Sequence, residues 1–148
     1  MDPNFEKAKE LVEATIRKIG LDPHVTRAAC PNDNQAAWTL KRGSASVLVT
    51  VTHQENEDVT YLRVASPVVK LPADSGNQVA LFRRLLELNA GGLANAGFGL
   101  LADRVVVVSE RPAADLDDAE VEQIVRHTAA VADTFDDRFE KEFGAPKA

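Results

Sequence analysis

The sequence has little of several residue types, and each shortage excludes a class of protein. Its 148 residues include one cysteine, Cys30, so no disulfide can form within the chain. No apolar run approaches the roughly 20 residues that a membrane-spanning helix needs, and the first residues lack the apolar core of a signal peptide. We therefore expect a protein that works in the cytoplasm and does not bind or cross a membrane.

Basic and aromatic residues are also scarce. The chain has 17 Lys and Arg against 23 Asp and Glu, which gives a net charge of −6. A negative charge repels phosphate backbones unless a basic patch is set apart, and the sequence has no such patch. One Trp, one Tyr and six Phe, most of the latter at helical core positions, are too few for a base-stacking sheet. The sequence therefore predicts no nucleic-acid partner.

The remaining composition is that of an ordinary folded domain. Hydrophobic residues make up 45% of the chain and charged residues 27%, far from the profile of a disordered protein. A chain of this length fits one domain with one core. We expect a single domain over residues 1–148.

Apolar residues at helical spacing predict three helices. The first covers residues 2–19, with Asp2 as its N-cap. The second covers residues 77–89 and ends before a glycine pair. The third starts at Asp117 and continues to about residue 143, with one long apolar stripe. A helix of that length is long enough to cross a whole sheet.

Alternating apolar and polar residues predict the strands. A weak candidate strand lies at residues 25–30, between turn-forming residues. The firmer strands lie at residues 36–42, 45–53, 59–66, 95–102 and 104–111. The first three of these are joined by short connections, which is typical of an antiparallel meander. The predicted fold is α+β, an antiparallel five-stranded sheet with the order α-β-β-β-α-β-β-α and helices packed across it.

The histidines and the cysteine are the main candidates for chemistry. His24, His53 and His127 do not have the spacing of a metal site, and we interpret His127 as a surface residue. No nucleophile signature surrounds Cys30. We therefore predict no catalytic residue, no metal and no cofactor. An enzyme would regain support if His24, His53 and Cys30 met in one pocket.

Two apolar features instead point to a binding surface. The predicted strand at residues 104–111 is apolar on both faces in its first half, whereas a sheet covered on one side should alternate. The predicted helix at residues 77–89 has an apolar arc of about half its circumference, more than one packing partner needs. We interpret both features as contacts of a homodimer; the alternative is that both are buried within the monomer. The predicted interface residues are Val79, Phe82, Leu86, Val105, Val106, Val107 and Val108.

The order of these segments resembles a known family. Residues 81–89 (LFRRLLELN) are followed by a glycine-rich gap, residues 98–100 (FGL), the valine strand, an Asp-Leu-Asp step and a long helix containing Ala132 and Asp133. This pattern is similar to the YbjN domain family, which shares its fold with class I type III secretion chaperones of the Tir-chaperone type. The resemblance covers about residues 36–140.

The resemblance implies a homodimer that binds proteins and does not catalyse a reaction. Chaperones of this type hold an effector's N-terminal segment in extended form. The chain has no recognisable effector-binding signature, so a secretion role and a YbjN-like regulatory role both stay open. Asn89 matches the end of the family's leucine-rich helix, and we expect it to satisfy backbone groups of the following loop. The alternative function is a sensor that buries a small apolar ligand between the sheet and the last helix.

Overall fold

The first helix begins where the sequence predicts. The computed structural model describes residues 2–148, and its helix α1 covers Pro3–Lys18. The Asp2 carboxylate accepts a hydrogen bond from the Asn4 N–H (3.2 Å), which satisfies one of the backbone donors that a helix start leaves unpaired. One stripe of the helix, including Val12 and Ile16, is buried against the core.

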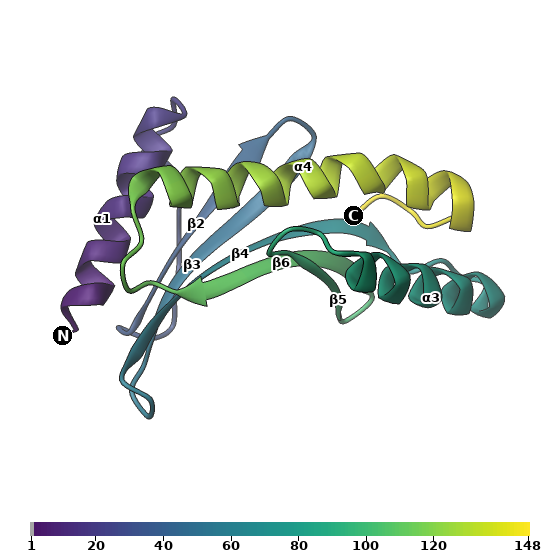
Figure 1. The fold of residues 1–148 in the computed structure, drawn as a ribbon. Coiled ribbons are helices and arrows are strands. Elements are labelled where there is room, and N and C mark those ends of the chain that lie inside the picture. Colours follow the sequence, from purple (N-terminus) through teal and green to yellow (C-terminus); the bar gives the residue numbers. More distant parts are fainter. Residues whose placement is uncertain (1) are drawn as a thin grey trace.

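Within residues 2–148, six antiparallel strands form one sheet in the order β1-β2-β3-β4-β6-β5 (Figure 1). The α+β class and the antiparallel pairing are confirmed, and the sheet has one strand more than the five predicted. The strands are β1 (Arg27–Ala28), β2 (Gln35–Arg42), β3 (Ala45–Gln54), β4 (Val59–Lys70), β5 (Gly97–Leu101) and β6 (Arg104–Pro112).

The extra strand comes from the weak candidate at residues 25–30, which is only partly a strand. A single helical turn, α2 (Pro23–Thr26), takes up its first residues. The Asp22 carboxylate caps this turn by accepting from the His24 N–H (2.8 Å), and proline suits the first helical position. Local capping therefore outweighs strand formation until Arg27, and β1 pairs with β2 over two residues only.

Strand β4 is longer than the predicted residues 59–66. Its pairing with β3 ends at Ala65, and its pairing with β6 continues to Lys70 through a register shift between Pro67 and Val69. Proline has no N–H to donate to a ladder, so it is tolerated where one side of a strand is unpaired. Pro67 therefore interrupts the pairing with β3 without ending the strand.

The helix after β4, α3 (Ser75–Gly91), carries in its last turn a residue whose role the sequence indicates. Asn89 donates from its side-chain amide to the Phe98 C=O (3.1 Å), and its amide oxygen accepts from the Phe98 N–H (2.8 Å). The expected structural role of Asn89 is confirmed, although the backbone it satisfies belongs to β5 and not to the loop.

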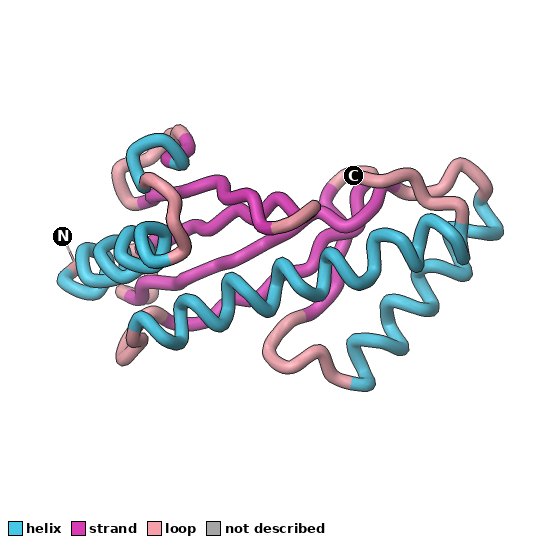
Figure 2. The backbone as a smooth tube through the Cα atoms, turned by 90° about the horizontal axis from the view of Figure 1, so that it is seen from above, coloured by secondary structure: helices cyan, strands magenta, loops and turns pink. Residues whose placement is uncertain are grey.

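The last helix, α4 (Asp118–Phe143), lies over the strands on the same side of the sheet as α1 (Figures 1 and 2). Its N-cap is Asp117, whose carboxylate accepts from the Glu120 N–H (2.8 Å), as the sequence predicts. Gly144 ends it with a left-handed φ of 66°. None of the helices described for residues 2–148 is long and apolar enough to cross a membrane.

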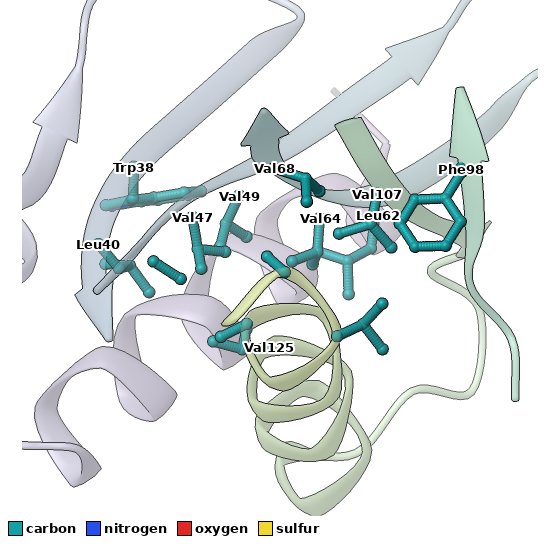
Figure 3. Packing of buried hydrophobic residues seen from close by; sticks show 14 of the residues in the cluster. Trp38, Leu40, Val47, Val49, Leu62, Val64, Val68, Phe98, Val107 and Val125 are labelled. Carbon is teal, nitrogen blue, oxygen red and sulfur yellow. The ribbon is translucent and has the colours of Figure 1, made fainter. Parts of the chain in front are cut away.

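The core fills the space between these helices and the facing side of the sheet. Val49 and Val64 point from the strands toward α4, which carries Val125, and the ring of Trp38 lies beside them along the sheet (Figure 3). At the far end of α4, the ring of Phe98 meets the ring of Phe135 edge to face, with 5.4 Å between centroids. These side chains occupy the space that the apolar-ligand hypothesis requires, so the packing gives that hypothesis no support.

Candidate interaction surfaces

Helix α3 carries apolar residues on opposite faces. Leu81 and Leu85 are buried in the core, whereas Val79 and Leu86 are 67% and 69% exposed. Phe82 is half-buried at the margin of the core. Because a helix turns by about 100° per residue, Val79 and Leu86 lie on nearly the same side of it. The helix therefore has more apolar surface than the folded monomer uses.

The exposed apolar residues of α3 form a shallow depression, which we call the α3 patch. Arg83 and Glu87 stand beside it as an exposed ion pair with 3.5 Å between nitrogen and oxygen. An apolar centre with a polar rim is the usual composition of a protein–protein interface. The patch is lined by Val79, Phe82, Arg83, Leu86, Glu87 and Ala90.

The four valines of β6 divide between the two faces of the sheet. Val105 and Val107 are fully buried in the core cluster. Val106 and Val108 lie on the opposite face, where Val106 is buried and Val108 is half-buried. Because Val106 is already buried within the monomer, the exposed residues of α3 carry most of the argument for an interface.

The face of the sheet away from α1 and α4 is partly apolar. Leu48, Ala65 and Val108 lie side by side on it across three neighbouring strands. Leu48 is 42% exposed, and the other two are half-buried. Both α1 and α4 lie on the other side of the sheet (Figure 1). The sheet therefore adds a second apolar surface to the one on α3.

The sheet also has a free edge beside its shortest strand. β1 pairs only with Ala37 and Trp38 of β2, which leaves the outer edge of residues 39–42 without a ladder partner among residues 2–148. An unpaired edge can accept an extended peptide as an additional strand.

A buried polar network joins the start of α1 to the β3–β4 hairpin. His53 is 9% exposed, and its Nδ1 lies 3.1 Å from the Thr60 hydroxyl, which donates to an Asp2 carboxylate oxygen (2.6 Å). The hydrogen bond from Thr60 lowers the pKa of Asp2 below its usual value, and so does the nearby His53. Sequence reasoning missed this network, although hairpin register places His53 opposite Thr60.

The other candidates for chemistry lie apart. A polar cleft of about 700 Å³ beside residues 31–35 is lined in part by His53, but neither His24 nor Cys30 lines it. His127 lies partly buried at the flank of the α4 stripe, where its Nε2 is 2.5 Å from the Leu93 C=O. In the described part of the chain, no three His, Cys, Asp or Glu side chains come together as metal ligands would.

The chain is an α+β domain with apolar side chains exposed on α3 and on the sheet, and comparison with known proteins gives its family. A family model described as "T3SS (YopN, CesT) and YbjN peptide-binding chaperone 1" matches residues 6–147. The chain belongs to this family, which confirms the resemblance read from the sequence. In a comparison with curated proteins, nothing matches the chain.

Solved structures with the same fold include chains from protein complexes. A chain of the ExsC–ExsE complex is 19% identical with a TM-score of 0.64, covering 93% of this chain and 96% of its own. A chain of the ExoU–SpcU complex of the Pseudomonas aeruginosa type III secretion system is 13% identical with a TM-score of 0.58, covering 85% of this chain and 95% of its own. The structure of the Yersinia pestis type III secretion chaperone SycH with a YscM2 fragment has a chain that is 14% identical with a TM-score of 0.55, covering 86% of this chain and 98% of its own. At such identities the likeness shows the fold alone.

Proposed function

We propose that this chain is a non-catalytic, peptide-binding chaperone that acts in the cytoplasm as a homodimer and holds an extended segment of a partner polypeptide. Residues 1–148 form the single domain that does this. The observation that carries the proposal is the α3 patch on a member of a peptide-binding chaperone family. Exposure of such a surface to water is unfavourable, and a partner that covers it lowers the free energy of the system.

The α3 patch is suited to self-association. In a two-fold dimer the same surface of both copies meets, so a patch must be complementary to itself. Val79 and Leu86 offer apolar contact at its centre, and the Arg83 and Glu87 charges can pair across a two-fold axis. Val108, half-buried on the sheet face away from α4, is the β6 residue best placed to extend the interface.

Sheet edges are suited to the partner polypeptide. The outer edge of residues 39–42, which has no ladder partner among residues 2–148, can hydrogen-bond an extended backbone whatever its side chains, while apolar surface beside an edge selects among sequences. The net charge of −6 favours segments that are not themselves acidic. The similar folds found in complexes with second proteins support the same kind of partner.

Fluorescence anisotropy with labelled peptides tests the proposal. Overlapping 20-residue peptides would span the proteins encoded beside this chain's own gene, with sequence-scrambled peptides as the control. We expect at least one segment to bind, and native mass spectrometry to show it bound to a dimer of 16.0-kDa chains. The proposal fails if no peptide binds above its scrambled control, or if protein purified from its source carries only a small apolar molecule.

A further inference from the structure

The chain turns back on itself after α4. The Gly144 N–H donates to the Glu140 C=O (3.0 Å), and the Ala145 N–H donates to the Phe139 C=O (3.4 Å). These bonds close the helix end and reverse the direction of the chain. Residues 144–148, which we call the return segment, then run back toward the sheet and reach β4 (Figure 1, yellow).

The return segment reaches the part of β4 that β3 leaves unpaired. Pairing with β3 ends at Ala65, so residues 66–70 have a free side away from β6, which we call the β4 edge. There the Lys70 N–H donates to the Pro146 C=O (2.7 Å), and Lys147 forms an isolated antiparallel bridge with Val69. The return segment therefore occupies the position of a short additional strand.

The β4 edge continues beyond the end of the return segment. The Ser66 hydroxyl donates to the Ser46 C=O (2.7 Å), at the point where β3 separates from β4. Between this point and Lys147 lies a cavity of about 160 Å³, lined in part by Pro67, Val68 and Ala132. A longer extended chain could follow the same edge into this cavity, because each strand residue advances by only about 3.3 Å.

Few contacts hold the return segment in place. Ala145 is fully buried but is a small side chain, and Pro146 and Lys147 are exposed. The Lys147 ammonium lies 2.7 Å from an Asp137 carboxylate oxygen, and both side chains are more than half exposed. Exposed ion pairs contribute little to stability. A competing strand therefore has little to displace.

We propose that the β4 edge is a strand-pairing site for an extended peptide, and that residues 144–148 fill this site as an internal substitute that the peptide displaces. This inference rests on the proposed peptide-binding function and adds a site and its regulation. The preferred peptide places a small residue where Ala145 lies and a basic residue two positions later, opposite Asp137. The carboxylates of Asp133 and Asp136, on the same helix, favour the same charge.

Hydrogen exchange at one backbone amide reports whether the return segment can leave. In the full chain, Lys147→Glu replaces an attraction to Asp137 with a repulsion, so we expect exchange of the Lys70 amide to accelerate about threefold. The double variant Lys147→Glu with Asp137→Lys restores the pair and should restore slow exchange. The control Lys7→Glu, at an exposed position of α1, should leave exchange unchanged. Unchanged exchange in Lys147→Glu overturns the inference.

A peptide titration then tests whether the vacated edge binds a strand. The probe is the capped peptide Gly-Ala-Pro-Lys-Ala, the sequence of residues 144–148, followed by NMR at the Lys70 amide. Lys147→Glu should respond at about threefold lower peptide concentration than the unsubstituted chain, because the tethered segment that competes with the peptide is weakened by loss of the exposed ion pair. The peptide Gly-Ala-Pro-Glu-Ala should bind more weakly than the probe.

The outcomes separate this inference from the proposed function. The Lys70 amide could respond equally to the probe in the unsubstituted chain and in Lys147→Glu, or in neither. Either result would overturn the proposal that the return segment occupies the β4 edge. If peptides from neighbouring proteins bind but leave the Lys70 amide unaffected, the chaperone function stands and this site is wrong. If the probe displaces the return segment while no such peptide binds, the site stands and the proposed function fails.

Discussion

Helices α3 and α4 are both capped by aspartate and both rich in apolar residues, yet the monomer uses them differently. In α4 the apolar residues form one stripe that is buried from Val121 to Phe143. In α3 only Leu81 and Leu85 are buried, while Val79 and Leu86 face water. The helices share an aspartate N-cap and differ in how their apolar residues are distributed.

This difference separates two uses of apolar surface. A single stripe that is buried in the monomer, as in α4, stabilises the fold. Apolar residues on two faces, as in α3, supply one face to the core and leave the other for a partner. Substitutions in the buried stripe of α4 should therefore affect folding, whereas substitutions on the outer face of α3 should affect association.

The largest expected effect lies on α4. Phe139 is 1% exposed and packs against Phe98 and Phe135, so Phe139→Ala should lower the free energy of unfolding by about 3–5 kcal/mol. Urea denaturation followed by circular dichroism measures this. Glu142→Ala, at an exposed position of the same helix, is the control and should change stability by less than about 0.5 kcal/mol. Similar losses for both variants would contradict the assignment of α4 to the core.

The two faces of α3 provide the next test. Leu81→Ala removes a fully buried side chain and should cost about 2–5 kcal/mol at every protein concentration. Leu86→Ala should cost little in dilute protein and progressively more as concentration rises, because dimer stability depends on concentration. Thermal denaturation over a hundredfold concentration range compares them. If the loss of stability in Leu86→Ala does not vary with protein concentration, Leu86 stabilises the monomer and not a dimer.

A smaller effect is expected where α3 meets β5. Asn89→Ala leaves the N–H and C=O of Phe98 without their side-chain partner, and unpaired polar groups in partly buried positions cost about 1–3 kcal/mol. Chemical denaturation measures the change in the free energy of unfolding. Hydrogen exchange at the Phe98 amide should become faster, which would show the local loss of protection. Slow exchange at Phe98 in the variant would show that another group holds β5.

The smallest effect is a dependence on pH at the start of α1. Because the hydrogen bond from Thr60 and the proximity of His53 lower the pKa of Asp2 below 3.8, the ionised carboxylate stabilises the fold above that pH. This contribution is lost as the pH falls through the lowered pKa. Asp2→Asn should therefore lower the melting temperature at pH 7 and have no effect at the lowest pH. An exposed control, Asp33→Asn, should show no such trend.

Local sequence patterns were enough to predict most of the elements. Helix caps at Asp2 and Asp117 and strict alternation in residues 45–53 are short-range signals, so those elements lie where expected. The short helix α2 was missed because Asp22 and Pro23 also suit a turn, and Val25 and Thr26 also suit the start of a strand. The length of β4 was missed because a proline within a strand normally indicates its end.

The candidate site could be predicted only in part. The wide apolar arc of α3 is visible in the sequence, but which of its residues are exposed depends on where Leu81 and Leu85 meet the core. Contacts between distant segments, such as Asp2 with Thr60 and Pro146 with Lys70, leave no periodic pattern. They depend on the three-dimensional path of the chain.

The mass of the protein in solution tests the central claim most directly. Light scattering coupled to gel filtration should give twice the 16.0-kDa chain mass for the unsubstituted protein, and one chain mass for folded Leu86→Glu. Ala80→Glu places the same charge at an exposed position of α3 outside the patch and should remain a dimer. A monomeric unsubstituted protein, or a Leu86→Glu variant that remains a dimer, would contradict the account.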